Sequence, residues 1–110
     1  MAQFSRAPVV TLTGATPVTL VSAPGASARK VYEGGIAVNK DSVNQTFIVS
    51  FVEGGTPTEI GRVTITTLLS GPLPGAPFVL EATDESITVE LTGAHTTTAP
   101  TAVAAIFEEP

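Results

Sequence analysis

The stretch VNQTFIVSFVEGG, residues 43–55, gives the clearest indication of the fold. Successive side chains of a β-strand point to opposite faces, and in this stretch both faces are apolar. One face holds Phe47, Val49 and Phe51, and the other holds Ile48 and Val52. We expect the first face to fill the core of the chain. We expect the second face to lie against another chain or a covering loop.

A turn follows this strand directly. The sequence EGGTPT, residues 53–58, is typical of the short glycine-containing loops that connect two antiparallel strands. It predicts a tight hairpin between residues 45–53 and a second strand, EIGRVTITTLL, over residues 59–69.

The rest of the chain also has the composition of strands and turns. Thr, Val and Ile are abundant, the 110 residues include 10 Gly and 9 Pro, and no window of a dozen residues has apolar positions at helical spacing. Turn residues delimit eight candidate strands, over residues 9–14, 17–23, 28–39, 45–53, 59–69, 78–82, 85–91 and 101–108. The pattern predicts one all-β domain, an antiparallel β-sandwich that is jelly-roll-like, with an immunoglobulin-like sandwich as the alternative.

Two segments interrupt this regular pattern. Gly34 and Gly35 indicate either a bulge or a break, and we treat residues 28–39 as one bent strand, with two short strands as the alternative. The segment SGPLPGAP, residues 70–77, contains three prolines. We expect it to be an extended crossover or a surface loop, and not a ladder strand.

The late part of the chain predicts another hairpin. Thr83 and Asp84 join the candidate strands of residues 78–82 and 85–91, and apolar residues alternate with polar ones along the second strand. We expect one face of that strand to lie in the core and the other to face water.

Charge and composition exclude several classes of partner. The net charge is −5, from ten acidic and five basic residues, and all five basic residues lie within the first 62 positions. Binding to a phosphate backbone needs clustered Lys and Arg, so we expect no nucleic acid partner. No apolar run approaches the roughly 20 residues of a membrane helix, so we expect no membrane partner. The segment MAQFSRAP has no secretory-signal pattern, and the absence of cysteine excludes disulfides and thiolate sites.

No residue pattern indicates a reaction. His95 lies in the polar stretch GAHTTTAP, without a G-x-S-x-G elbow elsewhere in the chain. Adjacent carboxylates such as Asp84 and Glu85 point to opposite faces of a strand and do not converge on a substrate. The segment KDSVN, residues 40–44, has too few oxygen ligands for calcium and is interpreted as a loop. We expect no catalytic residue, no cofactor, no metal and no enzymatic activity.

The order of these segments resembles that of a known group of proteins. VTLTGATPVTLVSAP, then ARKV, then IAVNKDSVNQTFIVSFVEGGT, then VTITTLLSGPLPGAPFVLEATDESITVEL and a closing strand together look like the small β-sandwich virion proteins of tailed bacteriophages. The resemblance spans about residues 9–107. It implies a structural protein of the capsid decoration (cement) type, made in the host cytoplasm and placed on the outer surface of the head. The major capsid protein would then be the partner and a homotrimer the assembly. The alternative is a fibre or tail-tip module that recognises a host glycan or protein.

The resemblance also implies an N-terminal arm that grips the shell. We therefore expect residues 1–8 to form an arm and residues 9–110 to form the single β-sandwich domain. Independently, a two-layer sandwich buries only one face of each sheet, so strands that are apolar on both faces predict an interface. The candidate residues of an oligomer or capsid interface are Phe4, Arg6, Ile48, Val52 and Ile106.

Overall fold

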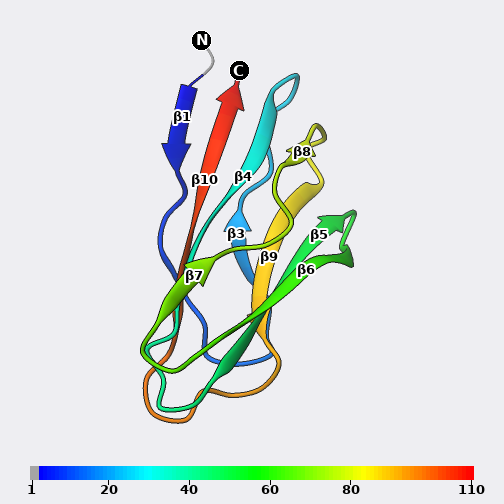
Figure 1. The fold of residues 1–110 in the computed structure, drawn as a ribbon. Helices are drawn as coiled ribbons and strands as arrows, with labels where there is room; N and C mark the ends of the chain where they lie inside the picture. Colours follow the sequence, from blue (N-terminus) through cyan, green and yellow to red (C-terminus); the bar gives the residue numbers. More distant parts are fainter. Residues whose placement is uncertain (1–2) are drawn as a thin grey trace.

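The computed structural model describes residues 3–110, which form two antiparallel β-sheets packed face to face (Figure 1). Residues 1 and 2 of the expected arm lie outside the described part. The strands are β1 (Gln3–Arg6), β2 (Val10–Thr11), β3 (Val18–Val21), β4 (Arg29–Val38), β5 (Gln45–Glu53), β6 (Thr56–Ile65), β7 (Ser70–Pro72), β8 (Phe78–Leu80), β9 (Glu85–Leu91) and β10 (Thr101–Glu109).

The strand order identifies a jelly roll. β1 and β2 pair with successive parts of β10, and β7 and β8 pair with successive parts of β4, so the ten strands occupy eight positions. The first sheet has the order β1/β2, β10, β4, β7/β8, and the second has the order β3, β9, β5, β6. In chain order the first position (β1/β2) pairs with the eighth (β10), and the second (β3) pairs with the seventh (β9). The third (β4) pairs with the sixth (β7/β8), and the fourth (β5) pairs with the fifth (β6). This is one long hairpin folded over on itself, as in a jelly roll, and it differs from the sheet order of an immunoglobulin sandwich.

The hairpin of β5 and β6 is confirmed. Glu53 pairs with Thr56, and the two residues between them, Gly54 and Gly55, have φ angles of 56° and 86°. Positive φ at both central residues suits the right-handed twist of the flanking strands, and glycine adopts it without strain.

The inward-facing apolar side chains of β5 and β9 fill the second sheet's side of the core. Phe47 and Val49 are fully buried, and so are Ile87, Val89 and Leu91 on the neighbouring strand, as expected. Side chains from the first sheet meet them from the other side, so apolar side chains fill the space between the sheets. The main first-sheet contributors are Tyr32, Ala37, Leu80, Ala102, Ala104 and Ile106.

The paired glycines of β4 form a bulge within one strand, as predicted. The register against β10 shifts between Ala104 and Ile106, opposite the glycines. Gly35 has a φ of 149°, and a Cβ placed there would lie 2.0 Å from the carbonyl oxygen of Val103. Only glycine fits this close approach of two backbones.

The proline-rich segment does contain a ladder strand, which corrects the expectation for residues 70–77. Ser70–Pro72 pairs with residues 36–38 of β4. Pro72 is tolerated because β7 lies at the edge of the sheet, where a missing N–H removes no ladder bond. The rest of the segment is a loop, in which Leu73 is buried and the Pro74 carbonyl accepts a 2.8 Å hydrogen bond from the Tyr32 hydroxyl.

The expected hairpin around Thr83 and Asp84 is wrong. β8 pairs with β4 in the first sheet, whereas β9 pairs with β3 and β5 in the second. The connection therefore crosses from one sheet to the other. The Glu85 carboxylate stabilises this corner by accepting hydrogen bonds of 2.7 and 2.8 Å from the amides of Glu81 and Ala82.

Candidate functional site

The outer face of the first sheet carries apolar side chains across four strands. The register places Phe4 opposite Phe107, Phe107 opposite Val31, and Val31 opposite Val79. The rings of Phe4 and Phe107 are in contact, with centroids 4.7 Å apart. Phe4 is 74% exposed and Val79 is 41% exposed. We call these four residues the outer row.

A second apolar group lies farther along the same face. Ile36 of β4 lies opposite Val103 of β10 and Pro72 of β7, and it is 51% exposed. Arg6 and Ala105 face each other between this group and the outer row. The core beneath is already filled by the alternate residues of the same strands. The outer row is therefore apolar surface that the chain does not use for its own packing, and the Arg29–Glu109 ion pair lies beside it on the same face.

The outer face of the second sheet is more polar. Arg62 forms an ion pair with Glu59, with Nε to Oε2 at 2.8 Å, and the hydroxyls of Thr46 and Thr64 are 2.8 Å apart. The hydrogen bond from Arg62 is the main reason that the pKa of Glu59 lies below its ordinary value. In the described part, none of the exposed large apolar side chains lies on a strand of the second sheet, which distinguishes this face from the outer face of the first sheet.

The residues expected at an interface do not form one patch. Phe4 and Arg6 lie exposed on β1, which pairs with β10, so the described part of the expected arm is an edge strand of the first sheet. Ile48 and Val52 point outward from the second sheet and are half-buried by their neighbours. Ile48 lies in register between Arg62 and Glu90 in this face.

Ile106 lies in the core, which corrects its assignment to an interface. It is 6% exposed, and it points between the sheets together with Ala104. Residue alternation along β10 instead turns Phe107 outward. The sequence of β10 is apolar on both faces, so it could not show which residues would be covered.

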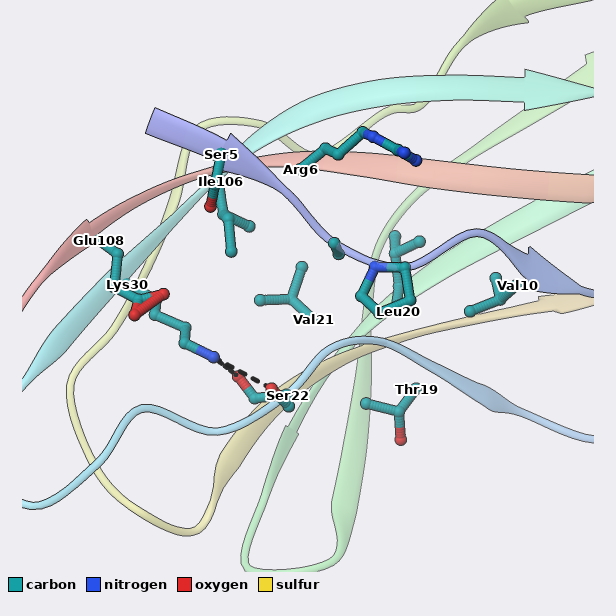
Figure 2. A pocket seen from close by; sticks show the side chains of 12 residues that line it. Ser5, Arg6, Val10, Thr19, Leu20, Val21, Ser22, Lys30, Ile106 and Glu108 are labelled. Atoms are coloured by element: carbon teal, nitrogen blue, oxygen red, sulfur yellow. Dashed lines mark hydrogen bonds between the residues drawn. The ribbon is translucent and has the colours of Figure 1, made fainter. Parts of the chain in front are cut away.

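A groove opens at one side of the sandwich, between β1 with the segment that follows it and β3. Its volume is about 360 Å³. The floor is made by Leu20, Val21 and Ile106, which are nearly fully buried. Figure 2 shows these side chains below β1 and above β3.

Three charged residues line this groove, two basic and one acidic: Arg6, Lys30 and Glu108. Lys30 donates to the carbonyl and hydroxyl oxygens of Ser22 at 3.2 and 3.0 Å. Arg6 runs along β10 and away from Val21 (Figure 2). Glu108 lies in register opposite Lys30, across β10 and β4. The groove is therefore an apolar hollow whose rim carries both basic and acidic side chains.

The opposite side of the sandwich is closed. The loop after β7 packs on β6 so tightly that a Cβ at Gly61 would lie 2.7 Å from the Cβ of Pro74. The Ile60 side chain covers Gly75 in the same way, with atoms 2.8 Å from where a Cβ would be. The open groove is thus a property of one side of the sandwich.

Asp41, which was expected only to be part of a loop, ties together two loops of the sandwich. Figure 1 shows the connections after β4 and after β9 at the end opposite the termini. The Asp41 side chain is fully buried. It accepts hydrogen bonds of 2.7 Å from the amides of Thr96 and Thr97, 2.9 Å from the amide of Ser42, and 2.8 Å from the Gln45 side chain. One carboxylate therefore joins residues 41–45 to a loop more than 50 positions later.

These donors also determine the acidity of Asp41. Burial alone would raise its pKa, but the hydrogen bonds from the amides and from Gln45 outweigh this effect, so the pKa lies well below its usual range. No lone pair is left for a ligand or a catalytic proton transfer. The carboxylate is a structural group.

The loops around Asp41 expose apolar side chains at the end of the molecule. Leu68 is 76% exposed, Leu69 is 57% exposed and Val43 is 43% exposed. Asn39 links the two loops that carry them, because its side-chain amide donates to the carbonyls of Val43 and Ile65, both at 2.9 Å. We call Val43, Leu68 and Leu69 the tip.

The remaining polar candidates do not converge. His95 is half-buried and its Nδ1 lies 3.0 Å from the carbonyl oxygen of Thr13, within a loop. Among residues 3–110, no three His, Asp or Glu side chains lie close enough to hold a metal ion. In the same part of the chain there is no helix of the length and apolar character needed to cross a membrane.

The comparisons with known proteins show the fold. No family model and no curated protein matches this sequence. Among solved structures, a protein of Bacillus endospore appendages, which are disulfide-linked pili, is similar over 97% of this chain and 85% of its own, at 15% identity and a TM-score of 0.53. A protein of the T13 particle of infectious bursal disease virus is similar over 99% of this chain, at 12% identity and a TM-score of 0.51. This chain spans 39% of that viral protein. At these identities the likeness concerns the β-sandwich alone.

Proposed function

We propose that this chain is a non-enzymatic structural protein of a virion, which binds the outside of a phage capsid as a decoration protein and stabilises the shell. The outer face of the first sheet carries the proposal. Its exposed apolar side chains lie over a core that is already complete, and contiguous apolar surface of this kind marks interaction sites. In the proposal the partner is the major capsid protein and three copies form the docking unit.

Two further observations support this proposal. The titratable side chains of the described part are dispersed, and the most buried carboxylate, Asp41, has all its hydrogen-bonding capacity in use within the fold. The sandwich is also a fold found in a pilus protein and in a virus particle protein. A structural role on an assembled particle agrees with both observations.

A fibre or tail-tip module that recognises a host glycan or protein is the alternative function. The tip favours it, because recognition surfaces commonly lie on loops that a rigid scaffold holds in place. Binding to host cells in the absence of binding to capsids would decide for this alternative.

Sedimentation with capsids tests the proposal. Purified protein is added to capsids assembled from the major capsid protein alone, and we expect binding at a fixed stoichiometry and a higher disruption temperature of the capsids. Val79→Asp places a charge in the outer row and should weaken this binding by about tenfold or more, because the charge would be desolvated in the contact. Thr64→Asp, on the polar face of the second sheet, is the matched control. Absence of both co-sedimentation and protection would refute the proposal.

A further inference from the structure

The edge of β1 that faces away from β10 is open. β1 stands at the end of the strand order of the first sheet, and β10 is its one partner strand in the described part (Figure 1). An edge strand presents unpaired N–H and C=O groups, and proteins commonly block such an edge with proline, charge, a bulge or a covering loop. All four residues of β1 are exposed, so no loop of the described part covers this edge.

β1 also lacks the prolines that protect the other edges. Each of the other edge strands of three or more residues in the described part contains a proline or directly follows one. These prolines are Pro17 before β3, Pro57 in β6, Pro72 in β7 and Pro77 before β8. β1 neither contains nor follows a proline, and its register against β10 continues without a bulge. Of these edges, β1 is therefore the one that another strand can extend.

The hydrogen bonds beside β1 identify which of its main-chain groups are free. The Ala7 amide donates to the Ala104 carbonyl at 2.9 Å and continues the register of β1. Hydrogen-bonded and non-hydrogen-bonded pairs alternate along an antiparallel ladder. Ser5 therefore directs its main-chain groups at β10, whereas Phe4 and Arg6 direct theirs at the open edge. The N–H and C=O groups of these two residues are available to another strand.

A second copy of β1 matches these groups. When two copies of β1 lie antiparallel about a two-fold axis at Ser5, Phe4 of each copy lies opposite Arg6 of the other. Both residues of such a pair direct their main-chain groups at the shared edge, so each of the two pairs exchanges two hydrogen bonds. Every free main-chain group of Phe4 and Arg6 then has a partner.

The side chains favour the same register. Phe4 and Arg6 are two positions apart and point to the same face, so each guanidinium comes beside a phenyl ring of the other copy, and a ring face attracts a cation. An axis at Arg6 would place like charges directly opposite each other, which is destabilising. It would also place Phe4 opposite Pro8, which has no N–H to donate. The axis at Ser5 avoids both conflicts.

We propose that β1 pairs with β1 of a second copy about a two-fold axis at Ser5, so that the first sheets of the two copies form one continuous sheet. The outer rows of both copies then lie on the same face of this sheet. The contact is isologous, so it differs from a ring of three copies and can join copies of neighbouring docking units. Four residues a side are far fewer than the roughly 20–30 of a standard interface, so we expect this contact in concentrated solution or on a shell.

Disulfide trapping tests the contact, because the chain has no cysteine of its own. In the proposed register the two copies of Ser5 form a non-hydrogen-bonded pair with Cα atoms about 4.5 Å apart, a distance that permits a disulfide. Concentrated Ser5→Cys protein should therefore form a covalent homodimer on mild oxidation. Gln3→Cys, on the same exposed strand, is the matched control. Its two cysteines would lie about 14 Å apart, so its homodimer yield should be at least about tenfold lower.

Proline at position 6 separates the contact from the fold. The Arg6 amide points at the open edge, so Arg6→Pro removes no hydrogen bond to β10. In the Ser5→Cys protein this substitution should leave the melting temperature unchanged and lower the homodimer yield about tenfold, because the added strand loses its donor and meets the proline ring. Arg6→Lys keeps both the N–H and the charge, and it should leave the yield unchanged.

Two results would overturn the inference. The first is an equal homodimer yield from Ser5→Cys and Gln3→Cys, a comparison that does not depend on the proline variant. The second is a Ser5→Cys yield that Arg6→Pro leaves unchanged. The pairing of β1 needs no capsid, so it is tested separately from the proposed function. Capsid binding without the specific homodimer refutes the β1 contact alone, and a specific homodimer without capsid binding refutes the proposed function alone.

Discussion

Truncation of Phe47 is the most direct test of how β5 faces the core. Phe47 is fully buried and lies in register between Val63 of β6 and Leu91 of β9. Phe47→Ala should cost about 3–5 kcal/mol, from lost apolar burial and from the cavity left between the sheets. A 110-residue domain has a total free energy of unfolding of about 5–15 kcal/mol. This one substitution should therefore remove a large part of the stability.

Phe51, two positions further along the same face, should respond differently. It is half-buried at the end of the strand, beyond the register shift at Val49 and Ser50, and its main aromatic contact is Phe78, with ring centroids 4.7 Å apart. Phe51→Ala should cost about 2 kcal/mol, because part of the ring already meets solvent and the aromatic pair contributes only about 0.5–1.5 kcal/mol.

Urea unfolding followed by far-UV circular dichroism measures both effects. With a slope of about 1–3 kcal/mol per molar urea, a loss of about 3–5 kcal/mol in Phe47→Ala should lower the midpoint by about 1–5 M. Ile48→Ala, on the outward face of the same strand, serves as the control and should lower the midpoint least of the three. If Phe51→Ala or Ile48→Ala is as costly as Phe47→Ala, the assignment of the two faces of β5 is wrong.

Three further predictions concern backbone fit and acidity. Gly35→Ala should destabilise the fold by more than about 2 kcal/mol, because the added Cβ would overlap the Val103 carbonyl. Gly25→Ala is the control, because no atom lies within 4 Å of the Cβ it would add. In thermal melts the control should change stability by no more than about 0.5 kcal/mol. The folded chain binds fewer protons at Asp41 than the unfolded chain, so stability should fall as the pH drops below about 4. Asp41→Asn should be less stable at pH 7, and its urea midpoint should fall less steeply as the pH is lowered than that of the unchanged protein. If the two midpoints fall equally steeply, Asp41 does not cause the acid destabilisation. Burial raises the pKa of Tyr32, so stability should fall above about pH 10, where the unfolded chain loses the phenol proton and the folded chain keeps it. Tyr32→Phe should remove that fall. At pH 7 it should cost about 1 kcal/mol, because the hydrogen bond to the Pro74 carbonyl is lost.

Local chemistry explains which parts of the fold the sequence predicted. Gly54 and Gly55 specify the β5–β6 hairpin because positive φ at both positions suits no other residue as well. The bend at Gly34 and Gly35 could be predicted in the same way, from the two glycines themselves. In both places the determining interactions lie within a few positions along the chain.

The errors arise where distant segments decide the outcome. β8 and β9 are adjacent in sequence and have hairpin-like spacing, but Leu80 and Ile87 fill the same core from opposite sheets. Pro72 excluded a strand by local rules, yet an edge position beside Ile36 of β4 was available for it. Neither pairing leaves a signal in the local sequence.

The candidate site was harder to predict for the same reason. Apolar residues occur on both faces of β10, and only the position of the second sheet decides that Ile106 is covered and Phe107 is not. Asp41 receives its donors from Thr96 and Thr97, 55 and 56 positions away. Leu68 and Leu69 are exposed in a loop whose position depends on such distant contacts, so no sequence pattern indicated the tip.

The expected homotrimer can be tested together with the outer row. A closed ring of three copies requires a rotation of about 120° per contact. Light scattering on the purified protein should then give three times the 11.2 kDa mass of one chain. If the outer row also joins the copies, Val79→Asp should reduce this mass to that of one chain, because the charge would be desolvated in the contact. A trimer that persists in Val79→Asp would mean that another surface holds the copies together.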